Sequence, residues 1–142
     1  MMDTEEKYKV VIIDDERSAS DALRRELEPY REFEIKGIAS SGAKGKKMIM
    51  ELHPDLLFLD IQLSDGDSFS FLTSARPSSV IIFTTAYDQY AIRAFTVNSV
   101  DYILKPVDEK RLLEAIVKYE TLVAANTSPE NGYLDVILDS LR

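Results

Sequence analysis

Five short apolar runs alternate along this chain with segments whose apolar residues recur every three or four positions. The runs predict β-strands at Lys9–Ile13, Phe33–Ala39, Leu56–Leu59, Val80–Phe83 and Val100–Leu104. The intervening segments predict amphipathic helices at Ser18–Tyr30, Gly42–Leu52, Ser68–Ala75, Tyr87–Val97 and Asp108–Ala125. Ser18 and Asp108 are the expected N-caps of the first and last helices. Strands separated by helices imply parallel, right-handed crossovers, so we expect a five-stranded parallel sheet with helices on both faces.

Composition excludes several classes of site. The chain has 142 residues, 45% of them hydrophobic, which suits one folded domain. Its 25 acidic and 17 basic residues give a net charge of −8, which disfavours non-specific binding of nucleic acid or anionic membrane. The absence of cysteine excludes disulfides, Cys-zinc sites and thiol nucleophiles. The one histidine, His53, precedes a proline in a predicted turn and is expected at the surface.

The two ends of the chain predict its location and domain limits. The N-terminus lacks the apolar segment of a signal peptide, and no apolar run reaches the roughly 18 residues of a membrane span. We therefore expect a cytoplasmic protein with no membrane partner. Residues 126–142 leave the alternating pattern and begin with a linker-like composition. We expect residues 1–125 to form the domain and residues 126–142 a linker or tail.

Polar residues follow four of the five predicted strands. They are Asp14, Asp15 and Glu16 after the first strand, Asp60 after the third, Thr84 and Thr85 after the fourth, and Lys105, which precedes Pro106, after the fifth. Parallel sheets carry their chemistry beyond the carboxyl ends of the strands, so these residues are expected to meet there. Taken singly, each has a structural explanation; an Asp-Asp pair, for example, can serve a helix macrodipole. Their joint occurrence predicts a site.

The residue types predict the chemistry of that site. Three carboxylates at one end of a sheet repel one another unless a cation lies between them, and oxygen-only ligands suit Mg²⁺. A lysine and a threonine hydroxyl beside them suit a phosphoryl group. A site with these groups and no histidine base fits phosphoryl transfer onto a carboxylate oxygen.

Four stretches carry a family resemblance. They are VVIIDDE (Val10–Glu16), PDLLFLDIQL (Pro54–Leu63), IIFTTAYDQYAIRAF (Ile81–Phe95) and VDYILKPV (Val100–Val107). Together they resemble the receiver domain of two-component response regulators, over about Tyr8 to Ala125. The stretch TTAYDQYAIRAF resembles the LytTR group in particular, whose receivers precede a DNA-binding domain. The resemblance implies a flavodoxin-like (βα)5 fold.

The resemblance also implies a role for each site residue. Asp60 is the expected phosphoacceptor for a histidine kinase. Asp15 and Asp60 are expected to ligate Mg²⁺ directly, together with the backbone carbonyl of Gln62, while Asp14 acts mainly through water. Lys105 is expected to contact the acyl phosphate.

Two further residues are implied to report the phosphorylated state. Thr85 is the expected switch hydroxyl, and Tyr102 is the switch aromatic that turns inward. The Lys105–Pro106 peptide bond is expected to be cis. Ser64 departs from the family, which usually has proline at this place, and the segment from Asp60 to Gly66 is short. The geometry of that segment therefore stays open.

The implied function is a phosphorylation-switched signalling domain. It is not an enzyme, apart from catalysing its own phosphorylation and dephosphorylation. We expect a phosphorylated homodimer that pairs through the fourth helix (Tyr87–Val97), the fifth strand and the fifth helix. Contact with DNA is expected only through an output domain absent from this chain. Tyr87 is expected to cover the phosphate and slow its hydrolysis.

Two other classes of function stay open. A metal-dependent phosphohydrolase could use Asp60 as a transient nucleophile, as haloacid-dehalogenase-type phosphatases do, but Gln62 stands where those enzymes carry their general acid. A receiver-like module that is never phosphorylated is the other possibility. The chain has all five residues that phosphorylation of a receiver would use, which argues against a module that is never phosphorylated. They are Asp14, Asp15, Asp60, Thr85 and Lys105.

Overall fold

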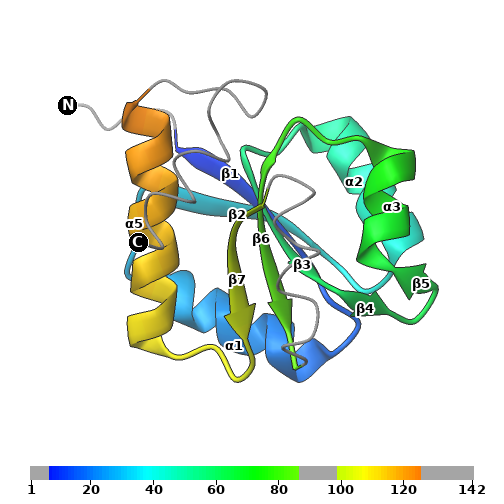
Figure 1. The fold of residues 1–142 in the computed structure, drawn as a ribbon, viewed down its shortest axis with the longest axis horizontal. Helices are drawn as coiled ribbons and strands as arrows, with labels where there is room; N and C mark the ends of the chain where they lie inside the picture. The colour runs from blue at the N-terminus through cyan, green and yellow to red at the C-terminus, as the bar shows by residue number, and fades with distance from the viewer. Residues whose placement is uncertain (1–6, 87–98, 126–142) are drawn as a thin grey trace.

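The computed structural model describes residues 7–86 and 99–125 and contains one five-stranded parallel sheet. Its strands are β1 (Tyr8–Ile13), β2 (Phe33–Ala39), β3 (Leu56–Asp60), β6 (Val80–Thr85) and β7 (Ser99–Leu104). They lie in the order β2-β1-β3-β6-β7, and every neighbouring pair is parallel (Figure 1). The predicted parallel sheet is confirmed.

Within residues 7–86 and 99–125, four helices cover the two faces of the sheet. They are α1 (Arg17–Leu27), α2 (Gly42–Leu52), α3 (Ser68–Ala75) and α5 (Glu109–Ala124). Figure 1 shows α2 and α3 on one side of the sheet and α1 and α5 on the other. Because successive strand residues point to opposite faces, the core divides into two clusters. Val10 and Ile12 pack with α1 and α5, whereas Val11 and Ile13 pack with α2 and α3.

The inner and outer strand pairings differ in regularity. The β1–β3 and β3–β6 pairings run without a shift in register. The β1–β2 pairing shifts between Val10 and Val11, and the β6–β7 pairing shifts between Ile81 and Ile82. The strands that carry the predicted site residues, β1, β3, β6 and β7, are consecutive in the sheet.

Several predicted element bounds are confirmed and one cap is wrong. The second and third helices have the predicted bounds, and Asp108 caps α5 by accepting a hydrogen bond from the Arg111 N–H over 2.7 Å. Ser18 is not the N-cap of α1. The helix begins at Arg17 because the Glu16 N–H binds the Asp14 carboxylate and the Glu16 carbonyl accepts the first helical hydrogen bonds. The predicted helix at Tyr87–Val97 lies outside the described residues.

The segment after Asp60, whose geometry the sequence leaves open, forms a small hairpin. Strands β4 (Gln62–Leu63) and β5 (Gly66–Asp67) pair antiparallel between β3 and α3. The two residues at its tip are Ser64 and Asp65.

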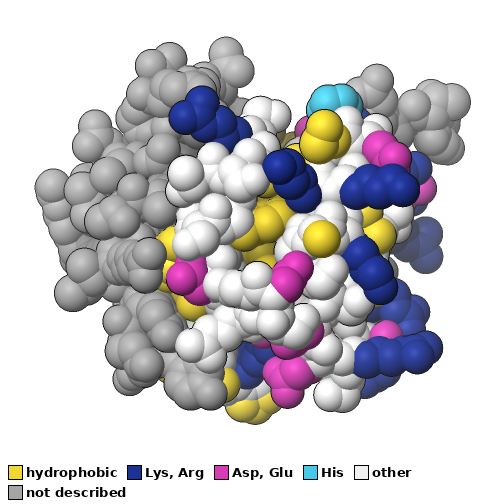
Figure 2. Space-filling view, turned by 90° about the vertical axis from the view of Figure 1, so that its right-hand side faces the viewer, with side chains coloured by type: hydrophobic (Ala, Val, Ile, Leu, Met, Phe, Trp, Pro, Cys, Tyr) yellow, Lys and Arg dark blue, Asp and Glu magenta, His cyan; other side chains and the backbone are white. Residues whose placement is uncertain are grey.

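The side of the molecule formed by α2 and α3 is locally basic although the chain is acidic. Figure 2 shows Lys and Arg side chains gathered along one margin of this side. Lys44, Lys46 and Lys47 of α2 are all exposed. His53, which ends α2 with a φ of 47°, is exposed as predicted. None of the helices in the described ranges is both long and apolar enough to cross a membrane.

Candidate functional site

The carboxyl ends of four neighbouring strands bring the predicted residues together. Asp14 directly follows β1, Asp60 ends β3, Thr85 ends β6 and Lys105 follows β7. The central parts of β1, β3 and β6 are buried runs of Val, Ile, Leu and Phe, so the polar residues that come after each run emerge at the same end of the parallel sheet.

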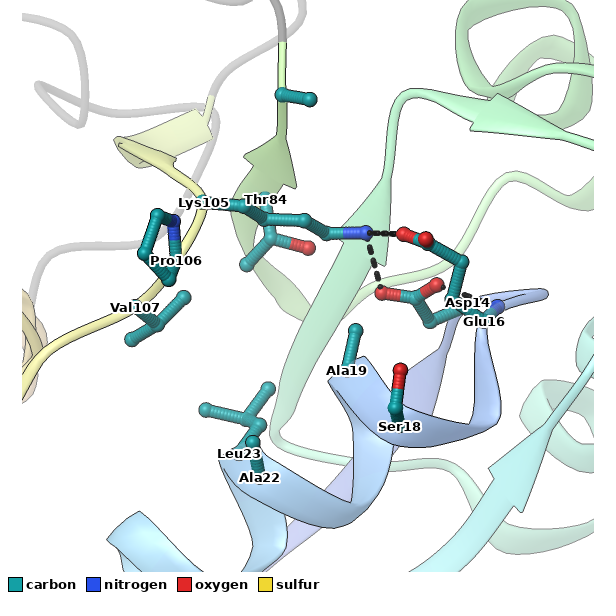
Figure 3. Close-up of a pocket in the computed structure, with 11 residues that line it drawn as sticks. Asp14, Glu16, Ser18, Ala19, Ala22, Leu23, Thr84, Lys105, Pro106 and Val107 are labelled. Carbon is teal, nitrogen blue, oxygen red and sulfur yellow. Dashed lines mark hydrogen bonds and ion pairs between the residues drawn. The ribbon is translucent and has the colours of Figure 1, made fainter.

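Lys105 is the centre of the site. Its ammonium lies 2.9 Å from Asp14 Oδ2, 2.9 Å from Glu16 Oε1 and 3.2 Å from Asp60 Oδ2. Figure 3 shows this side chain reaching from the β7 end towards the carboxylates of Asp14 and Glu16. The sequence assigns no role to Glu16, although its position directly after two aspartates indicates that it lies at the same end of the sheet.

The carboxylates at the site differ in their exposure to water. Asp14 and Asp60 are only 5% and 6% exposed, whereas Asp15 is exposed. Burial raises the pKa of Asp60 to about 6, with Lys105 opposing the rise and the Asp14 carboxylate adding to it. Burial would lower the pKa of Lys105, but hydrogen bonds and charges from Glu16, Asp14 and Asp60 outweigh it, so the pKa lies above its usual value. The lysine is therefore fully charged near neutral pH.

Three acids could hold a metal ion. Asp14, Asp15 and Asp60 each offer a carboxylate oxygen, and these oxygens lie within 4.8 Å of one another. Ligand oxygens around an octahedral Mg²⁺ lie roughly 3 to 4 Å apart, given Mg–O distances of about 2 Å. The donor set and its spacing fit a small hard cation. Gln62 is close by, since its backbone N–H lies 3.4 Å from Asp60 Oδ1.

The segment after Asp60 is held by Ser68, a residue with no predicted role. The Ser68 hydroxyl contacts the backbone carbonyls of both Asp60 and Ile61, and its N–H donates to the Ile61 carbonyl over 2.7 Å. Ile61 itself is fully buried. These contacts fix the backbone that directly follows the Asp60 side chain.

The remaining predicted residues lie on β6 and β7. Thr85 is fully buried, and its carbonyl accepts a hydrogen bond from the Lys105 N–H over 2.7 Å. Tyr102 is half-buried and packs against the core cluster shared with α2 and α3. The Lys105–Pro106 bond is cis, the geometry that the family resemblance implies.

A cavity of about 400 Å³ opens beside the lysine. Its polar lining includes Asp14, Glu16 and Lys105, and most of its apolar lining comes from α1 and from the segment after β7 (Figure 3). The apolar residues are Ala19, Ala22, Leu23, Ala86, Pro106 and Val107. The site therefore combines a charged interior with an apolar wall that a protein side chain could contact.

Comparisons with known proteins agree with this geometry. A family model described as a response regulator receiver domain matches residues 10–117. The sensory transduction protein LytT of Bacillus cereus is 44% identical over 115 residues, which cover 79% of this chain and 47% of that protein. The transcriptional regulatory protein BtsR of Escherichia coli is 39% identical over 112 residues, covering 78% and 47% of the two chains. The chain thus spans about half the length of the curated relatives it matches.

Solved structures match over nearly their whole length. The response regulatory domain of mrkE from Klebsiella pneumoniae has a TM-score of 0.72 at 30% identity, covering 80% of this chain and 95% of that one. The REC domain of AraT, a response regulator from Geobacillus stearothermophilus, has a TM-score of 0.74 at 28% identity, covering 84% and 98%.

Proposed function

The chain belongs to the response regulator receiver domain family, with relatives among LytTR-type regulators, and from this premise we propose that Asp60 accepts a phosphoryl group from a histidine kinase. One observation carries the proposal. The Asp60 carboxylate is buried at the end of the central strand β3, 3.2 Å from the Lys105 ammonium and within 4.8 Å of the two acids that follow β1. Phosphoryl transfer onto a carboxylate needs an anionic acceptor, a nearby positive charge and ligands for a metal ion. Asp60, Lys105 and the two acids after β1 supply these three parts.

The residues divide the reaction between them. An Asp60 carboxylate oxygen forms a bond to phosphorus while the bond from phosphorus to the kinase imidazole nitrogen breaks, and the imidazole leaves with its electron pair. Because the pKa of Asp60 is raised to about 6, the carboxylate is deprotonated and nucleophilic above that pH. The Lys105 ammonium stabilises negative charge on the transferred group.

Asp14, Asp15 and Asp60, with the Gln62 carbonyl, are the proposed holders of Mg²⁺. The bound cation would neutralise the phosphoryl oxygens as the new bond forms. The same arrangement supports self-catalysed phosphorylation and dephosphorylation, although the family is a signalling domain rather than an enzyme in the usual sense.

The phosphorylated state is proposed to change a protein surface through Thr85 and Tyr102. The described part of that surface includes β7 and α5, where Leu104, Leu113 and Val117 are 45%, 46% and 51% exposed. Large exposed apolar side chains at such a face support pairing of two copies. The predicted fourth helix, which would complete the face, lies outside the described residues.

The wider roles are proposals from the relatives. The names of LytT and BtsR support roles in sensory transduction and transcriptional regulation, and we propose that the chain acts in the cytoplasm, as its sequence predicts. Residues 1–125 would form the receiver, and residues 126–142 would be a linker or tail towards a DNA-binding output domain.

The test is incubation with acetyl phosphate and Mg²⁺ followed by measurement of the intact mass. We expect one added phosphoryl group in the wild type and in Asp21→Asn, which changes an acid on α1 away from the site. Asp60→Asn should add none. Phosphorylation retained in Asp60→Asn would contradict the proposal, and rapid continuous release of phosphate would instead favour a phosphohydrolase.

A further inference from the structure

The hairpin after Asp60 is held at both of its ends. Ser68 binds the backbone of Asp60 and Ile61 at its base. At its tip, Asp65 is followed by Gly66, whose φ of 137° is a conformation that side-chain-bearing residues rarely adopt. This turn directs the Asp65 carboxylate away from the hairpin and towards α2.

Asp65 binds the N-terminus of α2 with both carboxylate oxygens. Its Oδ1 accepts a hydrogen bond from the Gly42 N–H over 2.9 Å, and its Oδ2 accepts one from the Ala43 N–H over 3.1 Å. These two amides open the helix and have no partner within it. The local cap, Ser41, takes only the next amide, since its hydroxyl accepts from the Lys44 N–H over 3.2 Å. The helix start is therefore completed by a residue more than twenty positions away.

Electrostatics favour a carboxylate at this place. The first turn of α2 contains no acidic residue, while Lys44, Lys46 and Lys47 lie in its first half, at the positive end of the helix dipole. Hydrogen bonds from the Gly42 and Ala43 amides hold the pKa of Asp65 below its usual value. Asp65 is therefore charged at neutral pH and is attracted to the basic side of the molecule seen in Figure 2.

The approach between Gly42 and Asp65 is close. A Cβ placed on Gly42 would lie 3.2 Å from Asp65 Oδ1 and 3.3 Å from Phe71 Cδ1. A side chain at position 42 would therefore require the Asp65 carboxylate or the Phe71 ring to move by a few tenths of an ångström. Although Asp65 is exposed, its carboxylate is closely packed against the start of α2.

We propose that Asp65 is a positioning residue of the phosphorylation site. By binding α2 it fixes the hairpin that carries Gln62, and thereby the backbone carbonyl that would contact the cation. The inference rests on the proposed function, because it assigns Asp65 a role in cation binding at that site. It also makes cation binding and the start of α2 interdependent, and such coupling is reciprocal.

The experiment compares Asp65→Ala with Ser41→Ala. Both remove a cap from the N-terminus of α2, but only Asp65→Ala releases the hairpin. We expect Asp65→Ala to weaken Mg²⁺ binding about tenfold in isothermal titration calorimetry, the lower end of effects seen for groups that orient metal ligands. Ser41→Ala should bind Mg²⁺ as the wild type does. Equal affinity in the two variants would overturn the inference.

Amide hydrogen exchange gives a second measurement. Mg²⁺ should slow exchange at Gly42 and Ala43 in the wild type and in Ser41→Ala, since the hairpin connects both amides to the cation. Unchanged exchange at these amides would also overturn the inference. Gly42→Ala keeps the Asp65 carboxylate but displaces it from the start of α2. This variant should therefore weaken Mg²⁺ binding by less than Asp65→Ala does.

The outcomes separate this inference from the proposed function. A wild type that is phosphorylated on Asp60, with equal Mg²⁺ affinity in Asp65→Ala and Ser41→Ala, keeps the function and overturns the role of Asp65. A wild type that binds Mg²⁺ in an Asp65-dependent way yet accepts no phosphoryl group supports the role of Asp65 and overturns the function. A wild type that binds no Mg²⁺ overturns the inference.

Discussion

The Lys105 ammonium lies 2.9 Å from the Asp14 carboxylate, and the two side chains are only 14% and 5% exposed. Removing one partner of such a pair costs more stability than replacing both partners with apolar residues, because the other charge is then left buried and unpaired. Here a single lysine also serves Glu16 and Asp60. The stability of the metal-free domain therefore depends strongly on that one side chain.

Lys105→Met should lower the free energy of unfolding by about 3 kcal/mol at pH 7.5 without Mg²⁺, since it leaves Asp14 and Asp60 facing each other without a cation. Urea denaturation measures the loss. Added Mg²⁺ should recover more stability in this variant than in the wild type, because the cation replaces the missing charge. A variant as stable as the wild type in metal-free buffer would show that the ion pairs contribute nothing net.

The pH dependence of stability follows from Asp60. The folded state holds its proton up to a pKa of about 6, whereas the unfolded carboxyl has the ordinary value of 3.8. Between these values the folded state binds more protons than the unfolded state, so stability falls as pH rises through this window. Because solvent screens the site, we expect the free energy of unfolding to fall by only about 1 kcal/mol across this pH window. Thermal unfolding of the wild type and Asp60→Asn in metal-free buffer checks this, and the decline should be smaller in the variant.

Mg²⁺ should stabilise the wild type by linkage, by about 1.4 kcal/mol at a concentration ten times the dissociation constant. Asp15→Ala should remove most of this gain. Because Asp15 is exposed, its replacement should cost little stability in the absence of metal. Thermal melts across a Mg²⁺ titration measure both effects. Equal gains in the two proteins would remove Asp15 from the ligand set.

Tyr119→Ala should destabilise the domain by about 3 to 4 kcal/mol. The ring is 2% exposed and lies 5.2 Å from the ring of Tyr8 and 5.8 Å from that of Phe33. Tyr8 begins β1, so this cluster lies at the opposite end of the sheet from the acids. Chemical denaturation should show the loss, while calorimetry should find Mg²⁺ affinity unchanged in the folded variant.

The residues at the strand ends were predictable because a buried run fixes where the next polar residue emerges. Asp14 and Asp60 each follow such a run, Lys105 follows the strand β7, and their meeting follows from parallel topology. Ser68 and Asp65 were not predictable in the same way. Their partners lie in other elements, and only the folded hairpin brings them together. The wrong N-cap of α1 has a similar cause, since the Asp14 carboxylate starts the turn before Ser18 is reached.

The register shifts in the outer pairings of the sheet bear on aggregation. A bulge increases the local twist of a strand, and a twisted edge offers no flat row of amides and carbonyls to another chain. On β2, the exposed charges of Glu34 and Lys36 would also have to lose their water before a strand could add there. Within the described sheet, both edges therefore oppose growth by strand addition. Concentrated copies of this domain are expected to meet through helix surfaces and to resist forming extended β-assemblies.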